Sequence, residues 1–437
     1  MIRSKVTYAF LGLAALITLS AVIFWSPRIV RSANHFLTDK QNSSETATSE
    51  PQANSLQTKP AEELTKPSIK PSITPNLRDA AALVDQFAKA LQTADIDGIS
   101  KLINKSSLDT ATLNRLKELC TSPLQLRQID PIREIGELEM NNHSRWALTL
   151  DSRAPGNDQI VLDLRRMDGK WMIEKITLPS AQGTRAPMTI SLDSLGTADA
   201  FLQAILKQDF EAALRFTDQS TISNAKLAAL CILFEEGNYR LRESKPLRAI
   251  FHRTDAAGYL AYVQSSDANQ DAQFSITLHH PVGSSNWIVS EINLDQLLAD
   301  YTNRIAGGDS YFTPLVRNPA GGETLAIYFE FDQDQMNPRT RRQLEIVARI
   351  LLSDPGKKIT LSGHTDAMGT RDYNNSLSGR RASVVRDVLT KFGVNQSQIL
   401  TLAKGDSQPR RPNVLENGKD NPEGRRVNRR TEIYLDF

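Results

Sequence analysis

The sequence has few cysteines and histidines for its length. Of its 437 residues, two are cysteines and six are histidines, and Cys120 and Cys231 form no CxxC motif. A disulfide framework and a zinc site both lack the residues that they need, so we expect no metal and no cofactor. The charge is nearly balanced, with 52 basic and 50 acidic residues, and gives no general case for nucleic-acid binding. This length predicts roughly two to four domains.

Long apolar runs are also rare, with one exception near the N-terminus. An uncharged run extends from Tyr8 to Trp25, and a membrane-spanning helix takes roughly 17–25 such residues. Arg3 and Lys5 precede the run, and it ends in bulky residues rather than in the small residues of a signal-peptide cleavage site. These features favour an uncleaved signal anchor rather than a cleaved signal peptide. The anchor would comprise residues 1–31, with the N-terminus inside.

Residues 32–75 are rich in Ser, Thr, Gln, Pro, Lys and Glu and contain few apolar residues. A segment of this composition buries too little surface to offset the loss of chain entropy on folding. We therefore predict a disordered linker between the anchor and the folded part of the chain.

The segment from about residue 76 to 302 contains an internal repeat. Five short motifs recur in the same order at a spacing of 111 to 116 residues. The matched pairs are 87–91 with 201–205, 116–120 with 227–231, 131–133 with 246–248, 159–164 with 273–278, and 171–176 with 287–292. This ordered recurrence predicts a duplicated unit, with copies at 76–185 and 186–302.

Each copy begins with apolar residues at helical spacing and ends in alternating patterns joined by turns such as Asp168-Gly169. We predict helices followed by a curved antiparallel sheet, an α+β unit. This order, with strands that begin at Trp171 and Trp287, resembles the nuclear-transport-factor-two-like superfamily of cone-shaped α+β domains. That superfamily includes both enzymes and plain binding or spacer modules.

The residues of the repeats favour a role without catalysis. A proton-transfer enzyme needs a carboxylate or histidine directed into the cone, and the histidines do not recur between the copies. Asp95 and Asp209 do recur, but at predicted turns between helices, where capping explains them. Cys120 and Cys231 occupy equivalent places on apolar helix faces, which favours buried core thiols. The partner of the repeats is left open as an unknown protein or small molecule, with catalysis as the less favoured alternative.

A predicted linker at 303–322 leads into a C-terminal domain at 323–437. Strands are predicted at 324–331, 358–362, 399–403 and 430–436, with one helix from Pro338 and a second from about 374 to 392. The resulting order is βαβαββ, and its helical crossovers predict a two-layer α/β sandwich. The whole chain is then an α+β multidomain protein.

One residue of the second helix breaks the amphipathic pattern. At 100° per residue, Arg381 falls within the apolar stripe formed by Leu377, Val384 and Val385. An unpaired buried charge is very costly, so Arg381 must snorkel near the helix start, pair with Asp366, or bind a ligand. Asp366 follows the second strand, and two opposite charges aimed at one spot can hold a ligand with an amine and a carboxylate.

The pair is part of a longer pattern that includes Gly363-His364-Thr365-Asp366, Gly369, Tyr373-Asn374, Leu377-Ser378, Arg380-Arg381-Ala382 and Asn428-Arg429-Arg430. It resembles the OmpA-like peptidoglycan-binding domain, also found in Pal and in the stator protein MotB. In that family the matching aspartate and arginine grip the free amino-acid end of diaminopimelate in the peptide stem. The resemblance implies that Asp366 accepts from the ammonium, that Arg381 binds the carboxylate, and that the same groove is lined by Thr365, Asn374, Leu377 and Arg429.

Two neighbouring features have plainer interpretations. His364 is expected to be an exposed residue at the strand end, without a metal role. The loop at 408–426 is long and basic, and is either a solvated loop or an aid to binding an anionic glycan. The domain shows no nucleophile–base pair, so no hydrolase is expected.

The leading interpretation is a non-enzymatic protein of the bacterial cell envelope. It would span the cytoplasmic membrane once, place its bulk in the periplasm and bind peptidoglycan, with outer-membrane association less favoured. In the alternative, the OmpA-like domain only localises the protein while the repeats bind an envelope partner. An ion-driven stator is disfavoured because its membrane helix needs a carboxylate, and residues 8–25 contain none.

Overall fold

The computed structural model describes residues 79–104, 109–151, 158–179, 193–265, 271–281, 283–284, 286–304, 313–317, 322–336 and 338–437. The predicted anchor at 8–25 and the predicted linker at 32–75 lie outside these residues. Within the described part of the chain, no helix has both the length and the apolar character needed to cross a membrane. Residues 72–437 belong to one compact unit.

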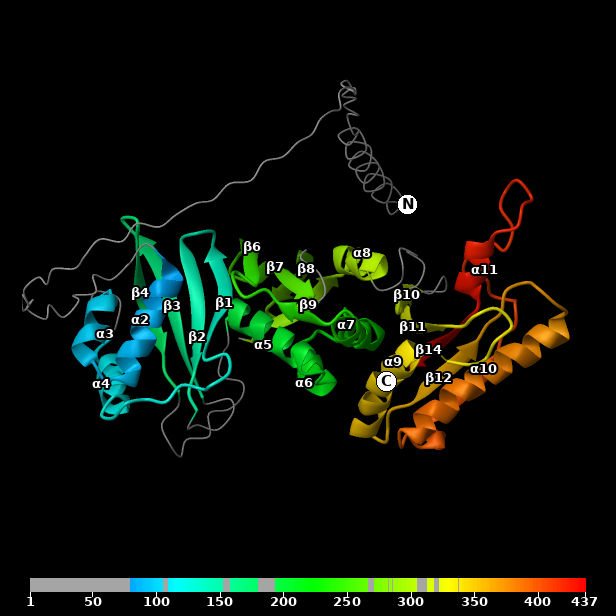
Figure 1. Cartoon of the computed structure of the whole chain (residues 1–437), viewed down its shortest axis with the longest axis horizontal. Helices are drawn as coiled ribbons and strands as arrows, with labels where there is room; N and C mark the ends of the chain where they lie inside the picture. The colour runs from blue at the N-terminus through cyan, green and yellow to red at the C-terminus, as the bar shows by residue number, and fades with distance from the viewer. Residues whose placement is uncertain are drawn as a thin grey trace, which may run out of the picture. The chain divides into compact units, whose positions relative to one another are not determined.

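The first α+β segment packs three helices against four antiparallel strands (Figure 1). The helices are α2 (Ala80–Gln92), α3 (Ile96–Leu102) and α4 (Thr110–Leu119), and the strands are β1 (Ile132–Glu139), β2 (His143–Thr149), β3 (Gln159–Met167) and β4 (Lys170–Thr177). Each strand pairs with the next along the chain. Leu83 and Phe87 of α2 are fully buried in the core of this segment, as the helical spacing predicts.

The second α+β segment repeats this order. It contains α5 (Ser194–Leu206), α6 (Phe210–Leu214), α7 (Asn224–Glu236), β5 (Tyr239–Leu241), β6 (Leu247–His252), β7 (Ala256–Ser265), β8 (Asp271–His279), β9 (Ile288–Asn293) and α8 (Asp295–Arg304). Asp95 caps α3 and Asp209 caps α6 by the same contact, a carboxylate accepting from a backbone amide three residues on. A register shift also falls at matched positions, after Asp163 in β3 and after Thr277 in β8. These shared details support the interpretation of a duplicated unit.

The strands of the two segments join into one nine-stranded sheet, in the order β4-β3-β2-β1-β6-β7-β8-β9 with β5 beside β7. The junction is a short parallel pairing of β1 with β6, with Glu137 opposite Arg248. Ion pairs strengthen this junction, because Arg133 of β1 donates to both carboxylate oxygens of Asp199 on α5, at 2.6 and 2.8 Å. The sequence predicts two sheets in tandem and does not reveal that their edges meet.

The C-terminal segment is a two-layer α/β sandwich. Its elements are β10 (Leu315–Arg317), β11 (Glu323–Tyr328), α9 (Pro338–Ser353), β12 (Ile359–Gly363), α10 (Arg371–Lys391), a 3-10 turn (Gln396–Gln398), β13 (Ile399–Ala403), α11 (Pro422–Asn428) and β14 (Arg430–Leu435). The sheet order is β10-β11-β14-β12-β13, with only β12 and β13 parallel. Helices α9 and α10 pack together against one face of the sheet (Figure 1).

Two elements of this segment are absent from the sequence-based prediction. Strand β10 lies inside the predicted linker at 303–322, and α11 begins inside the basic loop at 408–426 and ends two residues beyond it. Both are short, with three and seven residues. Segments of these lengths contain less than two turns of helix or two periods of strand. That is too short for the periodicity of apolar residues to indicate a helix or a strand. The linker prediction is therefore wrong at β10.

In helix α7, every residue from Leu227 to Phe234 is buried, so this stretch is covered on all sides. In α4, at the matching place in the first segment, only Leu116 is buried. Helix α7 packs against α5 and β5 of its own segment and also against α9 and β11 of the C-terminal segment. The second and third segments therefore share one continuous apolar core.

Candidate ligand-binding site

The residues predicted to line a groove lie on three elements that meet at the end of β12. Thr365 and Asp366 follow β12, Arg429 precedes β14, and the rest lie on one face of α10 at positions 374, 377 and 381. Gly363 permits this meeting, because a Cβ atom there would lie only 2.0 Å from the backbone oxygen of Ser378 on α10. All six predicted residues are buried.

Arg381 is completely buried, at 0% exposure. Its Nε donates to the carbonyl of Gln333 at 2.9 Å, Nη1 to that of His364 at 3.0 Å and Nη2 to that of Glu330 at 3.1 Å. Among the described residues, no acidic side chain forms an ion pair with it. Burial and the nearby Arg429 lower the pKa of Arg381 to about 10. Arg381 therefore neither snorkels nor forms an ion pair with Asp366. Its hydrogen bonds go to neutral carbonyls, and acidic side chains act on it only from a longer distance.

Asp366 pairs with Arg429. Its Oδ2 accepts from Nη1 of Arg429 at 2.9 Å, and its Oδ1 accepts from the backbone amide of Met368 at 3.1 Å. Both side chains of the pair are more than nine-tenths buried. The site thus holds two buried guanidinium groups and one buried carboxylate, and that carboxylate is paired directly with Arg429 rather than with Arg381.

Two neutral side chains at the same place have no hydrogen-bond partner among the residues that the structure describes. They are Thr365, through its hydroxyl oxygen, and Asn374, through both atoms of its amide, and both residues are at most 3% exposed. A buried polar group without a partner costs about 1–3 kcal/mol. Unpartnered donors and acceptors beside the buried guanidinium group of Arg381 are the arrangement expected of a binding site for a polar, anionic group.

The comparison with known families identifies the segment that carries this site. The model of the OmpA family matches residues 328–422. The C-terminal segment is an OmpA family domain. We call residues 323–437 the OmpA domain from here on.

Known relatives are similar to this chain over part of its length. Outer membrane porin F of Pseudomonas fluorescens is 36% identical over 112 residues, 26% of this chain and 32% of the porin. Peptidoglycan-associated lipoprotein of Pseudomonas aeruginosa is 37% identical over 83 residues, 19% of this chain and 49% of the lipoprotein. A crystal structure of the C-terminal domain of Helicobacter pylori MotB matches at 28% identity and a TM-score of 0.23, over 26% of this chain and 84% of that one. The chain spans less than half of either of the first two relatives.

His364 of the OmpA domain is buried at 1% exposure, so the expectation of an exposed residue is wrong. It lies on the face of the sheet opposite the helices, which the loop after β13 covers: Arg430 donates to the carbonyl of Gln408 there. Burial and the charge of Arg430 lower the pKa of His364 to about 3, so the imidazole is neutral at pH 7. Within the described part of the chain, neither ring nitrogen has a hydrogen-bond partner.

The basic loop at 408–426 contributes to the fold. Arg410 donates to Glu432 at 2.9 Å, and Arg425 donates to Asp420 at 2.6 Å. Burial alone would raise the pKa of Glu432, but Arg430, the hydroxyl of Tyr434 and Arg410 together lower it to about 2. Arg410 is therefore committed to a buried network and is not a free contact for a glycan.

The sequence does not point to one further part of the site, residues 329–336, which we call the β11–α9 loop. Its backbone carbonyls accept two of the three hydrogen bonds of Arg381. Backbone acceptors carry no signal in the sequence, so no residue pattern could have found them.

The α+β segments bury the side chains that sequence reasoning assigned to their cores. Cys120 and Cys231 are both free thiols and both buried, as predicted. Burial raises the pKa of Cys231 to about 12, so it is not a reactive thiolate at neutral pH. Tyr259 and Phe274 of the second α+β segment are at most 2% exposed and belong to the same apolar core as the buried residues of α5 and α7.

Proposed function

We propose that the OmpA domain binds peptidoglycan non-covalently by clamping the diaminopimelate of the stem peptide. The observation that carries the proposal is the fully buried Arg381, with which no acidic side chain of the described residues forms a direct ion pair. A buried cation of this kind is stabilised most by a carboxylate, which it binds through charge-assisted hydrogen bonds. The free end of diaminopimelate supplies a carboxylate and an ammonium group together.

Each residue of the site then has a distinct role. Arg381 binds the carboxylate, and Asp366 accepts from the ammonium while it keeps its contact with Arg429. The hydroxyl of Thr365 and the amide of Asn374 form hydrogen bonds with the same two groups, which removes the cost of leaving them unpartnered. Leu377 contacts the methylene groups between the two ends of the diamino acid.

In the cell, we propose that the protein links the cytoplasmic membrane to the wall. The support for this setting is the apolar run at 8–25 together with relatives named as outer-membrane and peptidoglycan-associated proteins. The two α+β segments would act as a spacer or as a platform for a partner. No enzymatic step is part of the proposal.

The direct test is sedimentation of the full-length protein with wall material. Asp366→Asn and Arg381→Gln should each reduce binding to diaminopimelate-containing sacculi at least tenfold, because each leaves one end of the ligand unpaired. Arg386→Gln on the same helix, where the arginine is partly exposed and pairs with Asp387, is the matched control. Sacculi that contain lysine in place of diaminopimelate should bind weakly, because they lack the carboxylate. Undiminished binding by both folded single variants would rule the clamp out.

A further inference from the structure

The β11–α9 loop lies against both arginines of the clamp. The carbonyls of Glu330 and Gln333 accept from Arg381, and the carbonyl of Phe329 accepts from Nε of Arg429 at 3.4 Å. A guanidinium group binds a carboxylate through the same N–H groups. In this structure, neutral backbone oxygens therefore occupy positions that a ligand carboxylate would take.

Side chains outside the clamp hold the loop in this position. The hydroxyl of Tyr373 on α10 donates to Asp332, and Arg380 lies 3.5 Å from Asp334. The ring of Phe331 lies 5.8 Å from the guanidinium carbon of Arg429, although this phenylalanine is 56% exposed. These contacts are at the surface, where ion pairs and single hydrogen bonds contribute little to stability. The loop is thus held over the clamp by weak contacts.

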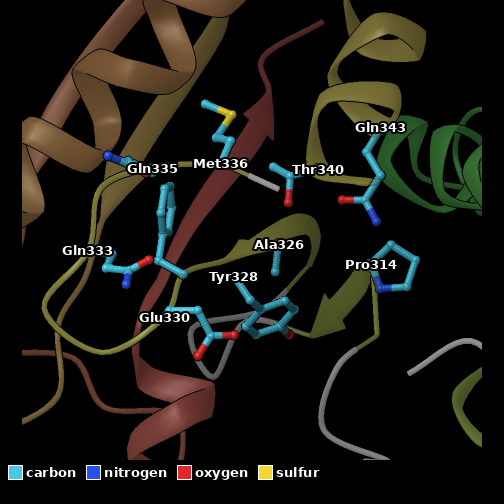
Figure 2. Close-up of a pocket in the computed structure, with 10 residues that line it drawn as sticks. Pro314, Ala326, Tyr328, Glu330, Gln333, Gln335, Met336, Thr340 and Gln343 are labelled. Atoms are coloured by element: carbon cyan, nitrogen blue, oxygen red, sulfur yellow. The ribbon is translucent and has the colours of Figure 1, made fainter. Parts of the chain in front are cut away.

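A cavity lies on the side of the loop that faces away from the clamp. It has a volume of about 190 Å³ and lies between the loop, β11 and the start of α9. Figure 2 shows Glu330, Gln333 and Met336 of the loop along one side, with Thr340 and Gln343 of α9 across from them. The same stretch of backbone therefore has the clamp on one side and open space on the other.

We propose that the β11–α9 loop is a lid, which closes the clamp in the free protein and withdraws toward this cavity when ligand enters. The step is an exchange: the ligand carboxylate replaces the carbonyls of Glu330 and Gln333 on Arg381. An anion forms stronger hydrogen bonds with a guanidinium group than a neutral carbonyl does. The lid therefore admits carboxylates and resists neutral amides, which deepens the proposed function and rests on it.

Tyr373→Phe tests the lid without changing the clamp. The variant loses only the hydroxyl that holds Asp332, so the closed state is weakened and the open state is not. In the full-length protein, titration calorimetry with meso-diaminopimelic acid should show binding roughly two- to tenfold tighter than in the wild type. Hydrogen exchange of the amides at 331–336 should be faster without ligand. Tyr434→Phe, which removes a hydroxyl that contacts Glu432 far from the loop, is the matched control.

The outcomes separate the lid from the clamp. Wild-type binding with no gain in affinity and no faster exchange in Tyr373→Phe would overturn the lid and leave the proposed function standing. If neither protein binds the diamino acid, the proposed function fails, and the lid fails with it as a gate for this ligand even if the loop exchanges faster. Tighter binding by Tyr434→Phe as well would show that the effect is not specific to the loop.

Discussion

Replacing His364 with leucine should make the protein more resistant to acid. The imidazole is 1% exposed, and neither of its nitrogens has a hydrogen-bond partner in the ranges that the structure describes. Its pKa is about 3 in the folded state, whereas an unfolded histidine titrates near 6.5. Leucine has a similar volume, removes two unpartnered polar atoms and cannot bind a proton.

The sign follows from which state binds the proton first. Because the folded-state pKa lies below the unfolded value, the unfolded chain takes up the proton as the pH falls through 6.5, and the free energy of unfolding decreases. The loss continues down to about pH 3, where the folded state is protonated as well. Each pH unit in this window is worth about 1.4 kcal/mol, so the wild type should lose about 2 kcal/mol by pH 5. Glu432 adds little there, because its carboxyl is depressed from 4.5 to about 2 and acts at lower pH.

The assay is urea unfolding of the full-length wild type and His364→Leu at pH 7.5 and pH 5.0, followed by circular dichroism. The deciding quantity is the change in the stability difference between the two pH values, because packing effects of the leucine cancel in it. We expect this change to be about 2 kcal/mol in favour of the variant. The exposed His252, replaced in the same way, is the control. Parallel pH dependence in the wild type and His364→Leu would refute the reasoning.

Two further predictions concern packing and charge. Gly363→Ala should lower stability by about 1–3 kcal/mol and weaken wall binding, because the new Cβ atom would lie 2.0 Å from backbone. Gly379→Ala should change neither property, because its Cβ atom would make an ordinary contact at 3.6 Å. Thermal unfolding of the two variants distinguishes these outcomes. Asp199→Asn should cost about 2 kcal/mol in urea unfolding, because it leaves the largely buried Arg133 without its counter-charge. The same change at the more exposed Asp271 should cost under about 1 kcal/mol, and equal losses would contradict the role of the junction ion pair.

The sequence could predict which face of α10 is buried, but not what Arg381 contacts. Its position in the apolar stripe follows from the 3.6-residue period, and the structure confirms full burial. Its contacts are backbone carbonyls from a loop about fifty residues away, and a carbonyl is the same at every residue. The pairing of Asp366 with Arg429 likewise depends on where β14 begins, a tertiary feature that spacing does not encode.

His364 shows the same limit on the other face of the sheet. Alternation places it opposite Gly363, on the side away from the helices, which in a two-layer sandwich is expected to face solvent. The loop after β13 covers that side instead, through contacts such as Arg430 with Gln408. Element types along the OmpA domain follow from local patterns, whereas the loops that close its surfaces depend on contacts far apart in the chain.

The packing of helix α7 limits where the chain can be truncated. Its apolar surface packs on α9 and β11 as well as on its own segment, so a truncation between the second α+β segment and the OmpA domain would expose apolar surface on both fragments. A fusion or a crystallisation fragment should therefore keep the second α+β segment and the OmpA domain together.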